Sequence, residues 1–192
     1  MGRARRRGAR RRVLSAALAA AAAGAALAGC DVVTVTLGSD GTPTTQSPSA
    51  GQAEGTPAVV ERVVDGDTVI VDLDGERQRV RLLNIDTPES VAEDRPVECL
   101  GPEASELAAD LLPAGAEVTL VFDEDRFDDY DRMLAAVYTE DGRNVSVELA
   151  RAGLAEAITV QPNDRFRPEV QEAMEEAQDA NRGLWDPSLP CA

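Results

Sequence analysis

The sequence has 192 residues, 35 of them acidic and 19 basic, and a formal net charge of −16 at pH 7. All 19 basic residues are arginine, so both lysine and histidine are absent. These absences exclude a Ser-His-Asp triad, a histidine-ligated zinc site, a lysine Schiff base and a Walker A loop. The remaining reactive groups are carboxylates, arginines, hydroxyls and cysteines, together with metal ions that prefer oxygen ligands.

The N-terminus has the composition of an export signal. Seven arginines between Arg3 and Arg12 precede an apolar run over residues 13–28, which ends in Leu27-Ala28-Gly29-Cys30. A basic start, a short apolar core and small residues at the end indicate a signal peptide. The ending resembles a bacterial lipobox, so residues 1–29 are interpreted as a lipoprotein signal peptide with Cys30 as the lipidated residue. The alternative is an ordinary signal peptide in which Cys30 is incidental. Both place the protein outside the cytoplasm, either lipid-anchored to the outer face of the cell membrane or secreted.

Residues 30–56 are rich in Thr, Ser, Gly, Gln and Pro, and they predict a disordered tether. Removing residues 1–29 removes seven arginines and no acid. The mature chain then has 12 arginines and 35 acids, a formal charge of 12 − 35 = −23. Proteins that bind nucleic acid are usually basic, so this charge predicts weak binding or strong local focusing by a few arginines and a cation.

Residues 57–192 are expected to form the folded domain. Apolar alternation and turn residues predict strands over 58–64, 68–73, 76–85, 118–122 and 133–139. Apolar residues at helical spacing predict helices over 102–112, 145–152 and 166–180. Local hairpins followed by helices indicate an α+β fold. A three-strand meander, a helix and two more strands fit a five-stranded OB-fold β-barrel with about three helices.

Cys99 and Cys191 are the cysteines that remain after Cys30, and they are too far apart in sequence for a metal-binding pair. Outside the cytoplasm, two such cysteines most often pair. We therefore expect a Cys99–Cys191 disulfide, with two free thiols as the alternative.

Three short segments concentrate acids and arginines: Asp65-Gly66-Asp67-Thr68, the run from Arg81 to Glu89, and Asp129-Tyr130-Asp131-Arg132. Each segment alone has an ordinary structural explanation, namely a turn, an edge strand ending in a polar loop, and a surface arginine. Strict strand alternation would place Arg81 and Asp86 on opposite faces. The strand must therefore bulge or end before Asp86 if both residues serve one site.

Together, the ordered motifs DGDT, RLLNIDTPE, GPEAS, YDRMLA, ARAGLA and GLW resemble those of the thermonuclease family, which is named for staphylococcal nuclease. The resemblance covers about residues 59–185. It implies an OB barrel with three helices that hydrolyses phosphodiester bonds of DNA and RNA with Ca²⁺ as cofactor.

The resemblance also implies a role for each motif residue. Asp67 and Asp86 are the expected carboxylate ligands of the metal, with the Thr87 carbonyl as a third ligand and Asp65 in the outer shell. Glu89 corresponds to the proposed general base, and Arg81 and Arg132 to the arginines that contact phosphate. Tyr130 is an expected substrate contact. The chemistry is consistent, because Ca²⁺ prefers oxygen ligands and guanidinium groups can bind phosphate through two hydrogen bonds.

The sequence departs from the best-known relative around this core. Two tyrosines that pack on the nucleotide there are Thr159 and Gln161 here, and a basic residue before Tyr130 is Asp129. We therefore expect an intact catalytic core with an altered grip on nucleic acid. The leading hypothesis is a monomeric extracytoplasmic nuclease. The alternatives are a non-catalytic OB-fold module that binds nucleic acid or another ligand at the cell surface, and a structural lipoprotein.

Overall fold

The computed structural model describes residues 54–90, 96–189 and 191. The predicted signal peptide, Cys30 and the predicted tether up to residue 53 lie outside the described residues. Within the described ranges, no helix is long and apolar enough to cross a membrane.

Five strands close into a barrel in the order β1-β2-β3-β6-β5. Their bounds are β1 Thr56–Asp65, β2 Thr68–Leu73, β3 Glu76–Leu82, β5 Glu117–Val121 and β6 Met133–Thr139. All neighbouring pairs are antiparallel except β3 and β6, which are parallel. This mixed closed barrel confirms the predicted five-stranded OB-type α+β fold.

Strand alternation builds the barrel core. Val80 and Leu82 of β3 are buried, whereas Arg79 and Arg81 point to the other side of the strand. The interior is filled mainly by β-branched and leucine side chains that are almost completely buried, among them Val60, Val71, Val80, Leu120 and Val137. The arginines of β3 are thereby directed to the barrel surface.

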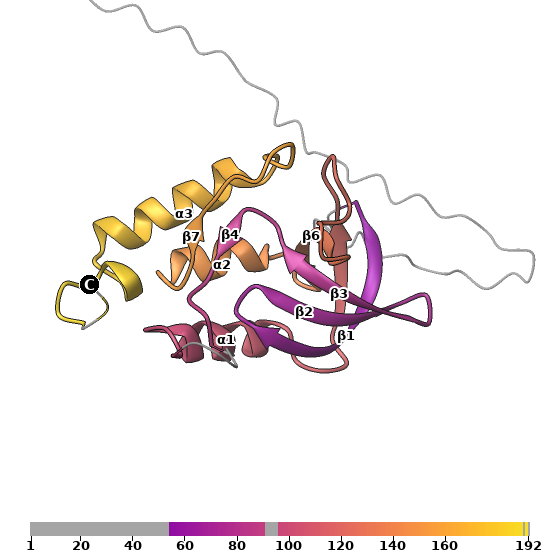
Figure 1. Ribbon diagram of the computed structural model, residues 1–192, viewed down its shortest axis with the longest axis horizontal. Coiled ribbons are helices and arrows are strands. Elements are labelled where there is room, and N and C mark those ends of the chain that lie inside the picture. The colour runs from indigo at the N-terminus through magenta and orange to yellow at the C-terminus, as the bar shows by residue number, and fades with distance from the viewer. Residues whose placement is uncertain (1–53, 91–95, 190, 192) are drawn as a thin grey trace, which may run out of the picture. The chain divides into compact units, whose positions relative to one another are not determined.

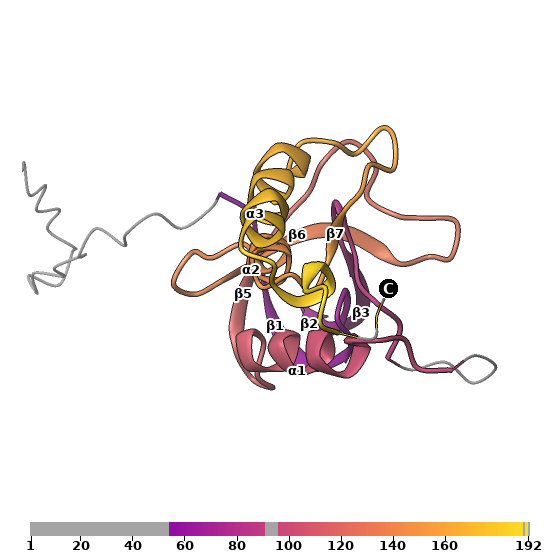
Figure 2. The same ribbon diagram turned by 90° about the vertical axis from the view of Figure 1, so that its left-hand side faces the viewer.

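Three helices cover the barrel: α1 Gly101–Leu111, α2 Val145–Arg151 and α3 Arg167–Asp179. Helix α1 packs against β1, and α2 packs against α3 (Figures 1 and 2). Small side chains such as Ala104 and Ala108 form the buried face of α1. The short 3₁₀ helix η1, Gly183–Trp185, follows α3 near the C-terminus.

The predicted strand over 76–85 is wrong at its C-terminal end. Strand β3 ends at Leu82, and Asn84 adopts a left-handed conformation with φ of 61°. The chain then forms β4, Ile85–Asp86, which pairs with β7, Glu156–Ala157. The Arg81 guanidinium donates hydrogen bonds to the carbonyls of Leu82 and Ile85, both at 2.9 Å, and so spans the break. The strand thus ends before Asp86, as a shared site for Arg81 and Asp86 requires.

Candidate active site

A cleft of about 450 Å³ opens where the β1–β2 turn, the end of β3, strand β4 and the start of β6 meet. Its lining includes all seven residues that the sequence assigns to catalysis or metal binding: Asp65, Asp67, Arg81, Asp86, Thr87, Glu89 and Arg132. The closure of the barrel therefore brings the three charged motifs together.

Arg81 lies between the two expected metal-binding carboxylates. Its Nη2 atom is 2.9 Å from Asp67 Oδ2 and 3.0 Å from Asp86 Oδ1. The side chains of Arg81 and Asp67 are 13% and 10% exposed, whereas that of Asp86 is 64% exposed. A buried and an exposed carboxylate thus share one cationic nitrogen.

The turn between β1 and β2 holds Asp67 in place. Its carboxylate accepts hydrogen bonds from Thr68 Oγ1 at 3.0 Å and from the Thr87 backbone N–H at 3.3 Å. A Cβ atom on Gly66 would lie only 2.7 Å from Thr87 Oγ1, so glycine allows the turn and the β4 segment to approach. The Thr-Pro segment is thereby fixed against Asp67.

Asp65 supports Asp67 from behind. Its Oδ1 atom accepts the Asp67 backbone N–H at 3.2 Å. Burial, and then the neighbouring Asp67 carboxylate, raise the pKa of Asp65 above the ordinary value. From this position Asp65 can hold the backbone of Asp67, which is consistent with the expected place of Asp65 in the outer shell of the metal.

The backbone of Glu89 is fixed by a reciprocal pair of hydrogen bonds. Its N–H donates to Glu98 Oε2 at 3.0 Å, and its carbonyl accepts the Glu98 N–H at 2.9 Å. A Cβ atom on Gly101 would lie 2.5 Å from the Glu89 carbonyl oxygen, so α1 begins in close contact with this segment. Glu89 therefore lines the cleft from a firmly held backbone position.

Asp128 orients Arg132. Its carboxylate accepts the Arg132 backbone N–H at 2.9 Å and Arg132 Nε at 2.6 Å. Burial alone would raise the pKa of Asp128, but hydrogen bonds from Arg132 and from the Tyr130 N–H outweigh it and lower that pKa. The guanidinium carbon lies 5.6 Å from the centre of the Tyr130 ring, which is itself exposed. The Arg132 guanidinium therefore lines the cleft while its Nε atom is hydrogen-bonded to Asp128 and its plane lies near the Tyr130 ring.

A second, more apolar recess of about 250 Å³ adjoins the cleft and shares Arg81 and Arg132 with it. Tyr130 lines this recess, and its role as a substrate contact stays a prediction. Its described lining includes Val160 but neither Thr159 nor Gln161. The two positions that lack tyrosine are thus not part of its described walls, where aliphatic side chains such as Ile158 and Val160 lie beside Tyr130 and charged residues.

Arg79, to which the sequence motifs give no role, also lines the cleft. It lies two residues before Arg81, so the alternation that exposes Arg81 places Arg79 on the same face. That parity was the available signal. Arg79 brings a third positive charge to a cleft that also holds four carboxylates.

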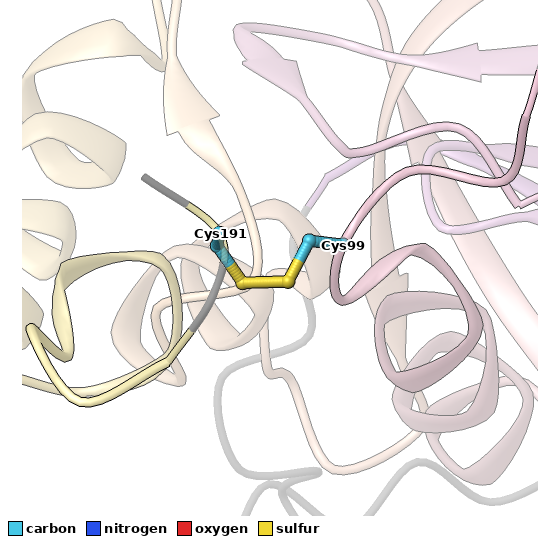
Figure 3. Close-up of a disulfide and its surroundings, with 2 residues drawn as sticks. All are labelled: Cys99 and Cys191. Atoms are coloured by element: carbon cyan, nitrogen blue, oxygen red, sulfur yellow. A yellow bond between two sulfur atoms is a disulfide. The ribbon is translucent and has the colours of Figure 1, made fainter.

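Cys99 and Cys191 form a disulfide with a Cα–Cα distance of 5.3 Å. Figure 3 shows that it joins the C-terminal segment to the segment that precedes α1. Cys99 is next to Glu98, so the bridge lies beside the segment that fixes Glu89.

The oxygen atoms of the cleft are of the kind that bind a hard metal ion. No group of three or more His, Cys, Asp or Glu side chains in the described part of the chain has metal-binding geometry. Asp67 and Asp86 nevertheless direct carboxylate oxygens at one cationic atom, Arg81 Nη2. Two carboxylates with the Thr87 carbonyl, water and a substrate oxygen would complete the six to eight oxygen ligands that Ca²⁺ takes.

Comparison with known proteins supplies the class. The family model described as "Staphylococcal nuclease homologue" matches residues 79–187. The chain is 39% identical over 138 residues to the thermonuclease of Staphylococcus intermedius, covering 72% of this chain and 81% of the relative. It is 39% identical over 127 residues to the thermonuclease of Staphylococcus hyicus, covering 66% and 73%. It is 35% identical over 131 residues to the endonuclease YncB of Bacillus subtilis (strain 168), covering 67% and 61%.

With these relatives, the barrel and its cleft of arginines and carboxylates define a nuclease that hydrolyses phosphodiester bonds. The chain belongs to the staphylococcal nuclease family.

Proposed function

We propose that this nuclease is a calcium-dependent endonuclease that cuts DNA, RNA or both outside the cytoplasm. The observation that carries the proposal is the convergence of Arg81 Nη2, Asp67 and Asp86 in a cleft that Arg132 and Glu89 also line. Phosphodiester hydrolysis needs positive charge at the phosphate oxygens and a base for water, and this cleft contains both.

Each side chain has a distinct task in the proposed reaction. Asp67, Asp86 and the Thr87 carbonyl would hold Ca²⁺, which when bound supplies positive charge next to the phosphate. Arg81 and Arg132 would contact the phosphate oxygens on which negative charge gathers. Glu89 would take a proton from the attacking water, a task that requires no histidine.

Arg81 must exchange partners when substrate binds. Its Nη2 atom is bonded to two carboxylates, whereas its Nη1 atom is bonded to the carbonyls of Leu82 and Ile85. Binding of a cation by the carboxylates would release Nη2 for the phosphate while Nη1 stays anchored. The arginine would then need only a small movement.

The proposed location rests on the N-terminal sequence pattern. We propose export under the direction of residues 1–29, followed by lipidation of Cys30 at the outer face of the membrane. Growth of cells that produce the full chain with a labelled fatty acid tests this, since a parent chain that takes up no label, or a Cys30→Ser variant that takes up as much, would contradict lipid anchoring.

The enzymatic test uses purified residues 31–192 with single-stranded DNA and RNA as substrates. We expect hydrolysis with Ca²⁺ and none when a chelator is in excess. Glu89→Gln should lower kcat by ~100- to 10,000-fold through loss of the base. Arg132→Ala should lower kcat by ~100- to 1,000-fold through loss of a transition-state donor.

Glu103→Gln is the matched control for Glu89→Gln, because Glu103 is exposed on α1 and lies outside the described lining of the cleft. It should keep full activity. Full activity of both Glu89→Gln and Arg132→Ala would overturn the assigned roles, and unchanged hydrolysis in chelator would overturn the calcium dependence.

A further inference from the structure

A third recess, of about 360 Å³, adjoins the cleft on the side of Asp86. It shares Asp86, Thr87 and Pro88 with the cleft. The disulfide cysteines Cys99 and Cys191 line it as well. This recess, called here the acidic recess, is therefore one of the directions in which a bound strand could leave the reacting phosphate.

The charges differ on the two sides of the cleft. The apolar recess shares Arg81 and Arg132 with the cleft, so these two cations oppose the carboxylates of its wall. The described lining of the acidic recess contains three carboxylates and no arginine: Asp86, Glu98 and Glu156. The two arginines of the apolar recess thus balance its two carboxylates, Asp128 and Asp129. Of the three carboxylates of the acidic recess, only Asp86 is paired with an arginine, Arg81.

Glu156 is the carboxylate best placed to act on substrate without a second task. Its partner in the β4–β7 register is Asp86, so the two side chains lie on the same face of this small sheet. The Asp86 carboxylate forms an ion pair with Arg81, and the Glu98 carboxylate accepts a hydrogen bond from the Glu89 N–H. Glu156 is exposed to solvent. Removal of its charge therefore leaves the described hydrogen bonds of the cleft unchanged.

Resting on the proposed function, we propose that Glu156 determines substrate length. Its carboxylate, with that of Glu98, repels a substrate phosphate that would enter the acidic recess. Single-stranded nucleic acid carries one negative charge per nucleotide, so each further phosphate on this side raises the cost of binding. The enzyme thereby favours short substrates with few phosphates beyond the reacting one.

The experiment compares two substrates of the same chemistry, a dinucleoside monophosphate with a single phosphodiester and a long single-stranded DNA. The parent protein, Glu156→Gln and Glu156→Arg are assayed with Ca²⁺ at low and high NaCl. Glu156→Arg should raise kcat/KM for the long strand by about fivefold to tenfold, because reversing a charge near a phosphate changes the interaction twice over. Glu156→Gln should lie between, and kcat/KM for the dinucleoside should change by less than about twofold.

Glu172→Arg is the matched control, because it makes the same change of net charge on the exposed face of α3, outside the described linings of the cleft and both recesses. It should change kcat/KM for either substrate by less than about twofold. In the parent, NaCl should raise the ratio of long-strand to dinucleoside kcat/KM, since salt screens repulsion, and this rise should be smaller in Glu156→Arg.

The outcomes separate the two hypotheses. If the parent hydrolyses neither substrate, the proposed nuclease function fails. If the parent is active but Glu156→Arg leaves the long strand unchanged, or Glu172→Arg has an equal effect, the role of Glu156 fails while the nuclease function stands.

Discussion

The charged side chains of the cleft are positioned by hydrogen bonds before any substrate arrives. Arg81 is bonded to two carbonyls and two carboxylates, and Arg132 is held by Asp128 through its backbone and its side chain. Apart from the exchange of partners proposed for Arg81 Nη2, charges that are already oriented need little reorganisation when negative charge develops on a phosphate. Asp128 is the residue of this network to which the sequence motifs give no role, and it orients Arg132 through two hydrogen bonds.

Asp128→Asn tests this at the level of one residue. The bonds from Arg132 and Tyr130 lower the folded-state pKa of Asp128 from its ordinary value of 3.8, so its ionised form stabilises the fold. This stabilisation is present above 3.8 and is lost as the pH falls through the lowered folded-state pKa. Asp128→Asn should therefore reduce the free energy of unfolding by about 1–2 kcal/mol at neutral pH. The deficit should shrink in acid.

Urea unfolding at neutral and acidic pH measures the difference. Asp129→Asn is the control, because Asp129 is the exposed neighbour and should show little change at either pH. A deficit for Asp128→Asn that is the same at both pH values would mean that its charge is not the source.

The break between β3 and β4 is the structural feature that unites the site. It places Arg81 and Asp86 on a common side although their sequence parities differ. Asn84 makes the break possible by taking φ of 61°, and its Nδ2 atom donates to the Asn163 carbonyl at 2.9 Å. A short polar side chain tolerates this left-handed backbone better than an aliphatic one does.

Two substitutions of Asn84 separate its backbone and side-chain roles. Asn84→Ala should cost about 2–4 kcal/mol of stability, because it loses a buried hydrogen bond and strains the left-handed backbone. Asn84→Gly loses the same hydrogen bond without that strain, so it should cost about 1 kcal/mol less. Urea unfolding of both variants measures this. An Asn84→Gly protein as unstable as Asn84→Ala would show that the backbone conformation is not limiting.

The disulfide ties the end of the chain to the segment beside the active site. Cys99 and Cys191 are separated by 92 positions, and the tail that carries Cys191 follows η1. A crosslink that closes so long a loop restricts the unfolded chain strongly. The same tie would hold Glu98, and with it the backbone of Glu89.

Removal of the disulfide should lower stability by about 4–5 kcal/mol in the chain-entropy account. Cys99→Ser, Cys191→Ser and the double variant should lose the same amount, because each breaks the same bond. Denaturant unfolding with and without a reductant measures the effect. The reductant should lower the free energy of unfolding of the parent and leave that of the double variant unchanged. If the reductant lowers both equally, its effect does not come from this disulfide.

Most of the secondary structure could be predicted from the sequence because it depends on residues close together in the chain. Strands β1, β2, β5 and β6 and the helices α1, α2 and α3 lie within one or two residues of their predicted bounds. The short elements β7 and η1 were not predicted. The end of β3 was predicted wrongly, because Val80 and Leu82 continue an apolar alternation that Asn84 interrupts. No local pattern marks Asn84 as left-handed, since its conformation is supported by residues far along the chain.

The sequence by itself determined the kind of chemistry. Without histidine or lysine, and with its acids and arginines in ordered motifs, the chain could be interpreted as a nuclease that acts through arginines and carboxylates. Motif order and residue type carry that information without any distance. They also identified the seven expected residues that line the cleft, although not Arg79.

Only the tertiary structure decided how those residues meet. The pairing of β3 with β6 brings Arg132, which precedes β6, into the same cleft as Arg81. The pairing of β4 with β7 sets Glu156 next to Asp86. Neither contact has a local pattern, because each joins segments that are distant in sequence. The asymmetric charge around the cleft arises from these long-range pairings, so it could be recognised only after the barrel had closed.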